Sequence, residues 1–329
     1  MLVSIITPSY NEEKYIQNFI DNVFSQNVDF VFELIIADGS NDNTKDIIKK
    51  NIINKKNLIL LNNPKRIVSE GLNKAIKKSV GDIIVRMDVH TKYDNYYLSN
   101  CVKVLKRTKA DCIGGPWNSL GKGKIGNAIS KAFNHPFSIG AAKSRLNNYS
   151  GYVDTVYLGC WYKTKLISLK GFDQKFVRNQ DDELCFRIKM NGGKIYQDKS
   201  IVSYYYVRES FYLLFKQFYQ YGYWKFFILK KYKRPASLRH LIPLFFVLYL
   251  FLIPFLIWIN LKFIFPFFIY ILILIIISMK DSKKLIFNIN LTKAITIIHF
   301  SYGLGFLFSF MKNIINIKVE NKLPESSRE

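Results

Sequence analysis

An aspartate and a histidine separated by one residue, Asp88 and His90, follow a short apolar run in the segment DIIVRMDVH, residues 82–90. The run has the length and β-branched content of a buried strand. Side chains two apart along a strand point to the same side, and open α/β sheets bind ligands at the carboxyl ends of their strands. The spacing therefore predicts a divalent metal held by Asp88 and His90, with the metal holding a phosphate. The alternative is an aspartate and a histidine in an ordinary surface loop.

Three consecutive acids, Asp181, Asp182 and Glu183, precede a helical pattern that includes Leu184 and Ile188. Acids are common at helix N-termini because they face the positive end of the macrodipole. A carboxylate that reaches a substrate hydroxyl can also act as a general base. A base is predicted here on the condition that the acidic run faces the metal site.

Strand-like and helix-like segments alternate over the first part of the chain and position these groups. Strands are predicted over 2–7, 32–37, 58–61, 82–90 and 152–158, and helices after Asn11 and over 67–79. Asn11 is expected to cap the first of these helices. The alternation predicts a mostly parallel sheet. Its strand ends at 7–11, 38–42 and 88–90 are expected along one edge, where they form a pocket.

Two uncharged runs, residues 241–259 and 263–279, lie in the second half of the 329-residue chain. Each approaches the roughly 20 residues that cross a bilayer. Only residues 260–262 separate them, which predicts a tight hairpin. A third apolar run, 294–310, is short for a span, and it either crosses the membrane or re-enters it.

The formal net charge is +24, and residues 210–240 contain seven Lys or Arg and no acid. This pattern predicts a cytoplasmic position beside anionic lipids. Half of residues 211–232 are Phe, Tyr or Trp, as in a helix that lies in the headgroup region. RNA binding by stacked aromatics is the alternative, and the apolar runs downstream disfavour it.

The N-terminus reads as a strand rather than as a signal peptide. The four cysteines show no close pairing, which favours free thiols in a reducing compartment. The part of the chain before the apolar runs is therefore expected in the cytoplasm.

Taken together, these segments resemble the inverting family 2 glycosyltransferases of the GT-A fold. Residues 3–13, VSIITPSYNEE, resemble the opening strand of that family, and 36–42 and 73–81 resemble its second and third motifs. Its D-x-D motif corresponds to Asp88-Val89-His90. Residues 180–187 resemble its E-D-x-D-L-x-x-R block, which places the expected base on Asp181. Segments 114–117, 152–156, 179–183 and 221–225 resemble, more narrowly, the succinoglycan-type exopolysaccharide branch.

The resemblance implies an α/β catalytic domain of GT-A type, with a Rossmann-like, mostly parallel sheet, followed by an interfacial helix and C-terminal transmembrane helices. The domains expected are 1–208 (catalytic), 209–240 (membrane interface), 241–311 (two or three membrane helices) and 312–329 (polar tail). The implied location is the inner membrane, with the catalytic domain in the cytoplasm.

The resemblance also implies site roles. The metal, Mn²⁺ or Mg²⁺, is expected on Asp88 and His90, and Asp38 is expected to accept from a uracil N–H if the donor is UDP-linked. The residues expected to bind the nucleotide-sugar are Pro8, Tyr10, Glu12, Asp38, Arg66, Asn73 and Asp88. Those expected on the acceptor side are Trp117, Asp182, Glu183, Gln217 and Trp224.

The partners implied are a nucleotide-sugar donor, a lipid-linked saccharide acceptor and the membrane, with no nucleic acid. Two alternatives stay open: transfer straight to polyprenyl phosphate, and a membrane-anchored nucleotide-sugar-binding scaffold without activity. Two departures from the family pattern have consequences. His90 replaces the second Asp of the D-x-D motif, which favours Mn²⁺ over Mg²⁺. The Q-x-x-R-W signature of processive members is absent after Gln217, which predicts transfer of a single sugar.

Overall fold

The computed structural model describes residues 1–235, 237–281 and 284–315. These residues form two compact units. The first unit comprises residues 1–118 and 143–206, and the second comprises 119–142 and the chain from 207 onward. The sequence did not show that residues 119–142 group with the C-terminal helices.

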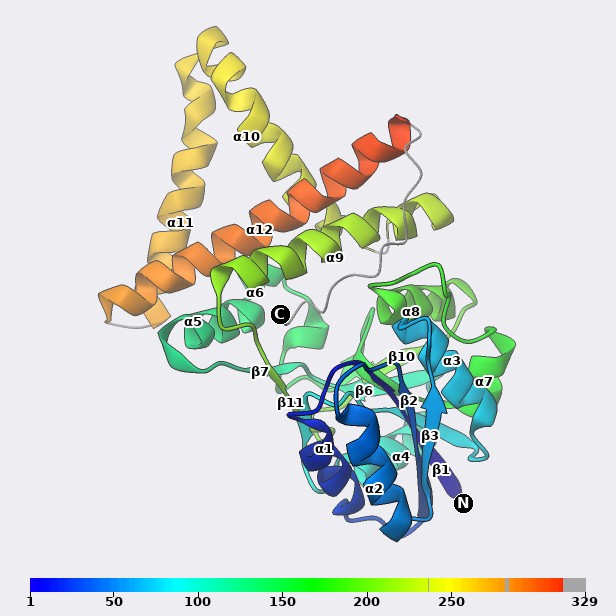
Figure 1. The fold of residues 1–329 in the computed structure, drawn as a ribbon. Helices are drawn as coiled ribbons and strands as arrows, with labels where there is room; N and C mark the ends of the chain where they lie inside the picture. The colour runs from blue at the N-terminus through cyan, green and yellow to red at the C-terminus, as the bar shows by residue number, and fades with distance from the viewer. Residues whose placement is uncertain (236, 282–283, 316–329) are drawn as a thin grey trace. The chain divides into compact units, whose positions relative to one another are not determined.

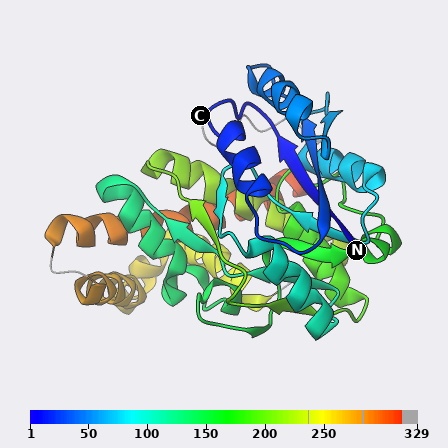
Figure 2. The ribbon, with the colours of Figure 1, turned by 90° about the horizontal axis from the view of Figure 1, so that it is seen from below.

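The first unit is built on an eight-stranded sheet of order β3-β2-β1-β4-β9-β6-β10-β8 (Figures 1 and 2). Its strands are β1 (Leu2–Ser9), β2 (Val31–Asp38), β3 (Leu58–Asn62), β4 (Ile83–Arg86), β6 (Cys112–Gly115), β8 (Gly151–Tyr152), β9 (Tyr157–Tyr162) and β10 (Ile195–Gln197). The strands β3, β2, β1 and β4 are parallel, whereas β9 is antiparallel to both of its neighbours. The mostly parallel sheet predicted from the sequence is confirmed.

Helices cover both faces of this sheet, because successive strand residues enter two different apolar layers. Ile5 belongs to one layer with α1 (Ile16–Phe24), α2 (Thr44–Asn54) and α4 (Tyr97–Thr108). Ile6 belongs to the other layer with α3 (Val68–Lys78), α7 (Lys163–Ser168) and α8 (Gln180–Met190). Burial on both faces explains why β1 and β2 read as almost continuous apolar runs.

A smaller sheet of order β5-β11-β7 completes the strands. It consists of β5 (Thr91–Tyr93), β7 (Asn118–Leu120) and β11 (Ser203–Tyr206). The strand predicted over 152–158 is wrong in its position: β8 ends at Tyr152 and β9 begins at Tyr157. The apolar run there continues to Tyr162, and its second half pairs with β4.

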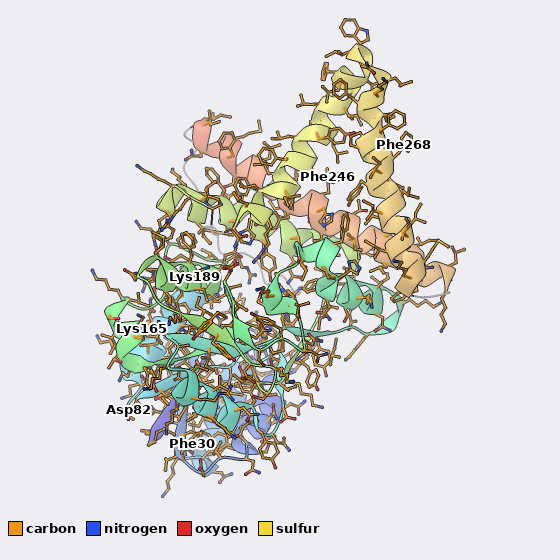
Figure 3. All side chains as sticks on the ribbon, turned by 180° about the vertical axis from the view of Figure 1, so that it is seen from behind. Phe30, Asp82, Lys165, Lys189, Phe246 and Phe268 are labelled. Carbon is orange, nitrogen blue, oxygen red and sulfur yellow. The ribbon has the colours of Figure 1, made fainter. Side chains whose placement is uncertain are left out.

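The second unit is helical. Its helices are α5 (Gly123–Asn134), α6 (Pro136–Ile139), α9 (Phe211–Tyr232), α10 (Ile242–Ile259), α11 (Phe265–Asp281) and α12 (Leu285–Ile314). Figure 3 shows the aromatic side chains along α10 and α11, among them Phe246 and Phe268.

Among the described residues, three helices are long and apolar enough to cross a membrane: Leu238–Ile259, Leu261–Lys280 and Leu285–Ile314. The tight hairpin between the first two is present, since Asn260 directly joins them and its side chain accepts from the Lys262 N–H. The third helix is not short, because it begins nine residues before the apolar run at 294 and extends over 30 residues.

Candidate active site

The carboxyl ends of β1, β2 and β4 meet at one edge of the main sheet, as the sequence predicted. The Asn11 N–H donates to Ser40 Oγ at 2.8 Å, and the Glu12 N–H donates to Thr44 Oγ1 at 2.8 Å. These bonds join the loop after β1 to the loop after β2 and to the first residue of α2. Asn11 itself does not cap α1, because its backbone has a φ of +54° and its side chain accepts from the Asn41 N–H instead.

Two of the predicted nucleotide-binding residues lie together at this edge. The Arg66 guanidinium lies 5.7 Å from the centre of the Tyr10 ring, and Arg66 Nη2 donates to Asn41 Oδ1 at 2.7 Å. Gly39 allows this approach, since a Cβ there would meet Asn63 O at 2.7 Å and Arg66 Cγ at 3.1 Å. An aromatic face beside a guanidinium suits a base next to phosphates.

Pro8 and Asp38 belong to the ends of β1 and β2, whereas Asn73 lies in α3. Asp38 is buried at the end of β2, and its carboxylate accepts from the Ser40 hydroxyl at 2.6 Å and from the Ser40 N–H at 3.2 Å. Pro8 is paired with Ala37 in the sheet. The Asn73 amide makes two 2.8 Å bonds with the backbone of Phe172, so its side chain fixes the loop that leads to α8.

Asp88 and His90 follow β4, which ends at Arg86. Asp88 is held by Arg86 through two hydrogen bonds, Nε to Oδ1 at 2.9 Å and Nη2 to Oδ2 at 3.0 Å. His90 Nδ1 lies 3.3 Å from Glu12 Oε1, which brings the end of β4 to the loop after β1. The two predicted metal ligands and a second carboxylate, that of Glu12, therefore stand at the same strand ends.

Arg86 is a site residue that the sequence reasoning missed. It is 5% exposed, and Nη1 makes no hydrogen bond in the structure. Burial works against its charge, but the neighbouring carboxylate of Asp88 raises its pKa overall, and Asp181 adds to this effect. Arg86 is thus a permanent buried cation that acts on two carboxylates from different elements.

Asp181 stands in the first turn of α8, after Asn179 in a left-handed conformation. Burial raises the pKa of Asp181, and so does the neighbouring Asp182, whereas the positive charge of Arg86 lowers it. The charge of Arg86 therefore acts on the predicted base as well as on the predicted metal ligand Asp88. The role of Asp181 as the base stays a prediction.

Glu183 has a different part in α8. Its side chain is fully buried, and it pairs with Arg187 through Nε at 3.1 Å and Nη2 at 2.8 Å. Arg187 also donates to the carbonyls of Leu169 and Gly171. Glu183 therefore has a structural role in place of the predicted acceptor contact, because its ion pair with Arg187 holds the loop before α8 and its carboxylate has no exposed surface.

Trp117 belongs to an aromatic stack beside the metal pair. Its ring lies 4.7 Å from that of Tyr157 at 14°, and the Arg145 guanidinium lies 3.6 Å from its centre. Tyr205 links this stack to His90, with ring centroids 5.0 Å from Trp117 and 6.2 Å from His90. Tyr157, Tyr205 and Arg145 carried no signal in the sequence, because each depends on contacts between distant segments.

Gln217 and Trp224 belong to α9 in the second unit. Gln217 is buried and donates from Nε2 to the Tyr221 hydroxyl at 2.9 Å. Trp224 packs against Tyr223 and Phe227.

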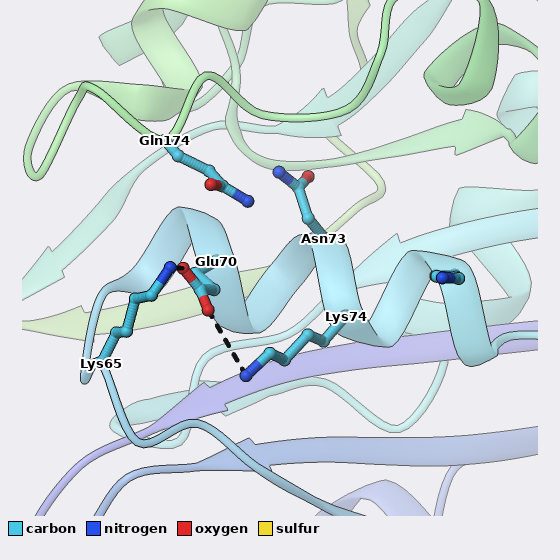
Figure 4. Close-up of a pocket in the computed structure, with 6 residues that line it drawn as sticks. Lys65, Glu70, Asn73, Lys74 and Gln174 are labelled. Atoms are coloured by element: carbon cyan, nitrogen blue, oxygen red, sulfur yellow. Dashed lines mark ion pairs between the residues drawn. The ribbon is translucent and has the colours of Figure 1, made fainter.

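A separate hollow of about 230 Å³ lies on α3 (Figure 4). The Lys65 and Lys74 ammonium groups lie 3.0 and 3.4 Å from the two carboxylate oxygens of Glu70. The bond from Lys65 lowers the pKa of Glu70, although burial opposes the shift. These charges stabilise the start of α3 and its preceding turn. The hollow is lined by Lys65, Glu70, Asn73, Lys74, Lys77 and Gln174.

The available side chains suit a metal ion whose remaining ligands come from the substrate. The described residues contain no group of three or more His, Cys, Asp or Glu side chains arranged to hold a metal by themselves. The predicted ligands are one carboxylate and one imidazole, those of Asp88 and His90. Mg²⁺ and similar ions are commonly bound by one or two carboxylates together with substrate phosphates, so the residues present fit such a site.

Comparison with known proteins gives consistent matches. The profile described as Glycosyl transferase family 2 matches residues 4–158. A protein of Methanococcus voltae named dolichyl N-acetyl-alpha-D-glucosaminyl phosphate 3-beta-D-2,3-diacetamido-2,3-dideoxy-beta-D-glucuronosyltransferase is 31% identical over 242 residues, 70% of this chain and 74% of that protein. The succinoglycan biosynthesis protein ExoA of Rhizobium meliloti is 26% identical over 243 residues, 73% of this chain and 74% of that protein.

Among solved structures, the mannosyltransferase PcManGT from Pyrobaculum calidifontis, in complex with GDP-Man and Mn²⁺, matches with a TM-score of 0.60 and 15% identity. The match covers 96% of this chain and 88% of that chain. The likeness shows the fold, and the GT-A architecture predicted from the sequence is confirmed.

Proposed function

The chain belongs to glycosyl transferase family 2 and is a glycosyltransferase, and from this premise we propose that it moves one sugar from a UDP-linked donor to a lipid-linked saccharide at the cytoplasmic face of a membrane. The product is an intermediate of a surface glycan, such as an exopolysaccharide or a capsule. The names of the two curated relatives support this proposal, since one names a dolichyl-phosphate-linked sugar and the other succinoglycan biosynthesis. The long apolar helices support the membrane location.

One observation carries the proposal: Arg86 pairs with the predicted metal ligand Asp88 at the strand ends where Tyr10 and Arg66 lie together, and its charge lowers the pKa of the predicted base Asp181. Tyr10 and Arg66 would hold the nucleotide and its phosphates. Asp88 and His90 would hold Mn²⁺ or Mg²⁺, and the bound metal would neutralise the charge that develops on the departing diphosphate. The solved structure of PcManGT contains Mn²⁺ in a protein of the same fold.

The chemical step needs one carboxylate and one cation from this chain. Asp181 accepts the proton of the acceptor hydroxyl as the oxygen attacks C1 of the sugar from the face opposite the diphosphate. The new C1–O bond forms as the bond from C1 to the diphosphate oxygen breaks, which inverts the anomeric centre. Arg86 holds Asp88 in a fixed orientation throughout, and the proton remains on Asp181 until product leaves.

The test uses membranes that contain the full chain, Mn²⁺, a panel of UDP-sugars and other nucleotide-sugars, and either a lipid-linked saccharide extract or purified polyprenyl phosphate. Release of nucleoside diphosphate and the mass of the lipid product are measured. Product on the saccharide extract with a UDP-sugar, absent for Asp181→Asn, supports the proposal. If product forms only on polyprenyl phosphate, the acceptor is polyprenyl phosphate and not a lipid-linked saccharide. If no donor is turned over, the chain is better explained as a binding scaffold.

A further inference from the structure

We propose that α12 does not cross the bilayer: it lies along the membrane surface beside α9, so that only the hairpin of α10 and α11 enters the hydrocarbon. The inference rests on the proposed membrane placement of that hairpin and is independent of which sugar is transferred. The partner of the surface formed by α9 and α12 is then the headgroup layer. All the contacts that support it lie within the second unit.

The three long helices differ in how much of their apolar surface the protein covers. In the most apolar stretch of 18 residues, 44% of the residues of α12 are buried inside the protein. The corresponding share is 6% for the helix that contains α10 and 11% for the helix that contains α11. The helix α12 is also less apolar than the other two helices. The hairpin therefore presents bare apolar surface that requires lipid, whereas protein already covers much of α12.

One helix that covers α12 is α9, and the two run alongside each other (Figure 1). Glycines permit the close contact: a Cβ on Gly222 would lie 1.9 Å from Tyr302 O, and one on Gly305 would lie 2.1 Å from Tyr219 O. Further along, Phe226 packs on Phe306 and Phe310.

The contact continues to the end of both helices, where the ammonium of Lys230 donates to the side chain of Asn313. Besides Lys230, α9 carries Lys216, Lys225 and Lys231 within its 22 residues. Four cations in one helix oppose passage through hydrocarbon, but they suit anionic headgroups. A helix packed along α9 over this distance shares its place at the interface.

The middle of α12 is covered on another side by the polar segment that contains α5 and α6. His299 Nε2 lies 3.2 Å and 3.1 Å from the carbonyl oxygens of Phe137 and Ser138 in α6. Since carbonyls only accept, this nitrogen donates. The helix α5, which also packs on α12, contains Lys124 and Lys131. If α12 crossed the bilayer, these groups would be drawn to the depth of its midpoint, where charge and open backbone are costly.

The hairpin contacts α12 through residues of both of its helices. Gly303 lies against Pro243 and Val247 of α10, and His299 Nδ1 lies 3.0 Å from the Tyr270 hydroxyl of α11. At the tip Phe255 is 70% exposed and Trp258 is 90% exposed. An exposed Trp next to a polar turn is suited to the far headgroup layer.

The proposal predicts that both ends of α12 are on the side of the catalytic unit. Three single substitutions test this in the full chain: Leu285→Cys and Ile314→Cys at the two ends of α12, and Ile53→Cys in α2, all at exposed positions. The four native cysteines are buried, so the unsubstituted chain is the blank. Sealed vesicles of right-side-out and inverted orientation are treated with a membrane-impermeant maleimide.

All three cysteines are expected to react in the same vesicle orientation. Reaction of Ile314→Cys in the opposite orientation to Leu285→Cys would overturn the proposal, because it would place the bilayer between the ends of α12. The labelling reports only the side of the membrane, so a chain that fails to transfer sugar still gives a decisive result.

A second measurement reports depth along the helix. Nitroxide labels at Ile289, Phe300 and Met311 are spaced by eleven residues, which keeps them on one face of the helix. Collision rates with oxygen and with a water-soluble nickel chelate are compared. Similar depths at the three positions are expected. A label at position 300 that lies roughly 15 Å deeper than the other two, as a rise of 1.5 Å per residue requires for a crossing helix, would contradict the proposal.

Discussion

Arg86 and Asp88 form a paired arrangement in which both nitrogens of one edge of the guanidinium meet both oxygens of the carboxylate, at 2.9 and 3.0 Å. Both side chains are largely buried. Planar pairing of this kind fixes the carboxylate in direction as well as in charge. Asp88 is therefore already oriented before a metal or a donor binds.

Replacing Arg86 by Gln is expected to reduce the sugar-transfer rate and the apparent affinity for Mn²⁺ by about 10- to 100-fold, as is typical for residues that orient a metal ligand. The change removes the charge and one of the two bonds to Asp88. Transfer is measured as a function of Mn²⁺ concentration. Arg86→Lys, which keeps the charge but not the paired geometry, is expected to recover only part of the loss. An unchanged Mn²⁺ titration for Arg86→Gln would show that the pair does not orient a metal ligand.

Exchange of His90 for Asp tests the origin of the metal preference. A carboxylate oxygen suits Mg²⁺ better than an imidazole does, so His90→Asp is expected to lower the ratio of the Mn²⁺-supported to the Mg²⁺-supported rate by about tenfold, equivalent to roughly 1.4 kcal/mol. Rates with each metal at saturation give the ratio. Glu12→Gln is the matched control, because it changes the residue 3.3 Å from His90 Nδ1 without changing the imidazole. Equal ratios in the wild type and in His90→Asp would argue against His90 as a ligand.

Asp181→Asn is expected to lower the transfer rate by roughly 10²- to 10⁴-fold, the usual contribution of a general base, without a comparable loss of stability. Asp46→Asn is the matched control, since Asp46 is an exposed surface residue paired with Lys49. Loss of activity in both variants to the same degree would remove the special role of Asp181.

The rate should also depend on pH in a direction that the structure fixes. Burial raises the pKa of Asp181, so the reactive carboxylate is lost at a higher pH than for an exposed aspartate, and the rate falls as the pH decreases through that raised value. Arg86 lowers the pKa of Asp181. Arg86→Gln should therefore move the acid limb of the profile of kcat to higher pH. A shift to lower pH, or none, would indicate that the two groups do not interact during catalysis.

Most of this site was accessible from the sequence because strand ends mark it. The segments after β1, β2 and β4 were assigned by their turn residues, and the parallel sheet places them together. Arg86 was missed because it is the last residue of a short apolar strand, where the pattern gives no reason to expect a functional cation. Its role appears only when α8 is packed against that end of the sheet.

The acidic run of α8 shows the opposite limit. Three neighbouring carboxylates are alike in sequence, but a helix turns by about 100° per residue, so they face different surroundings. The charge of Arg86 lowers the pKa of Asp181, whereas Glu183 pairs with Arg187 and is fully buried. Which acid is the base and which belongs to the fold depends on the rotation of α8, and the run alone does not specify it.

This division of roles gives the last prediction. Glu183→Gln removes one partner of a buried ion pair and is expected to destabilise the fold by about 3–5 kcal/mol, because Arg187 loses its buried counterion. Thermal unfolding of the full chain in detergent should show a lowered Tm for Glu183→Gln and a nearly unchanged Tm for Asp181→Asn. The double variant Glu183→Gln, Arg187→Met should recover part of the loss, since no charge is then left without its partner. A Glu183→Gln chain with normal Tm and impaired transfer would instead return Glu183 to the acceptor side of the site.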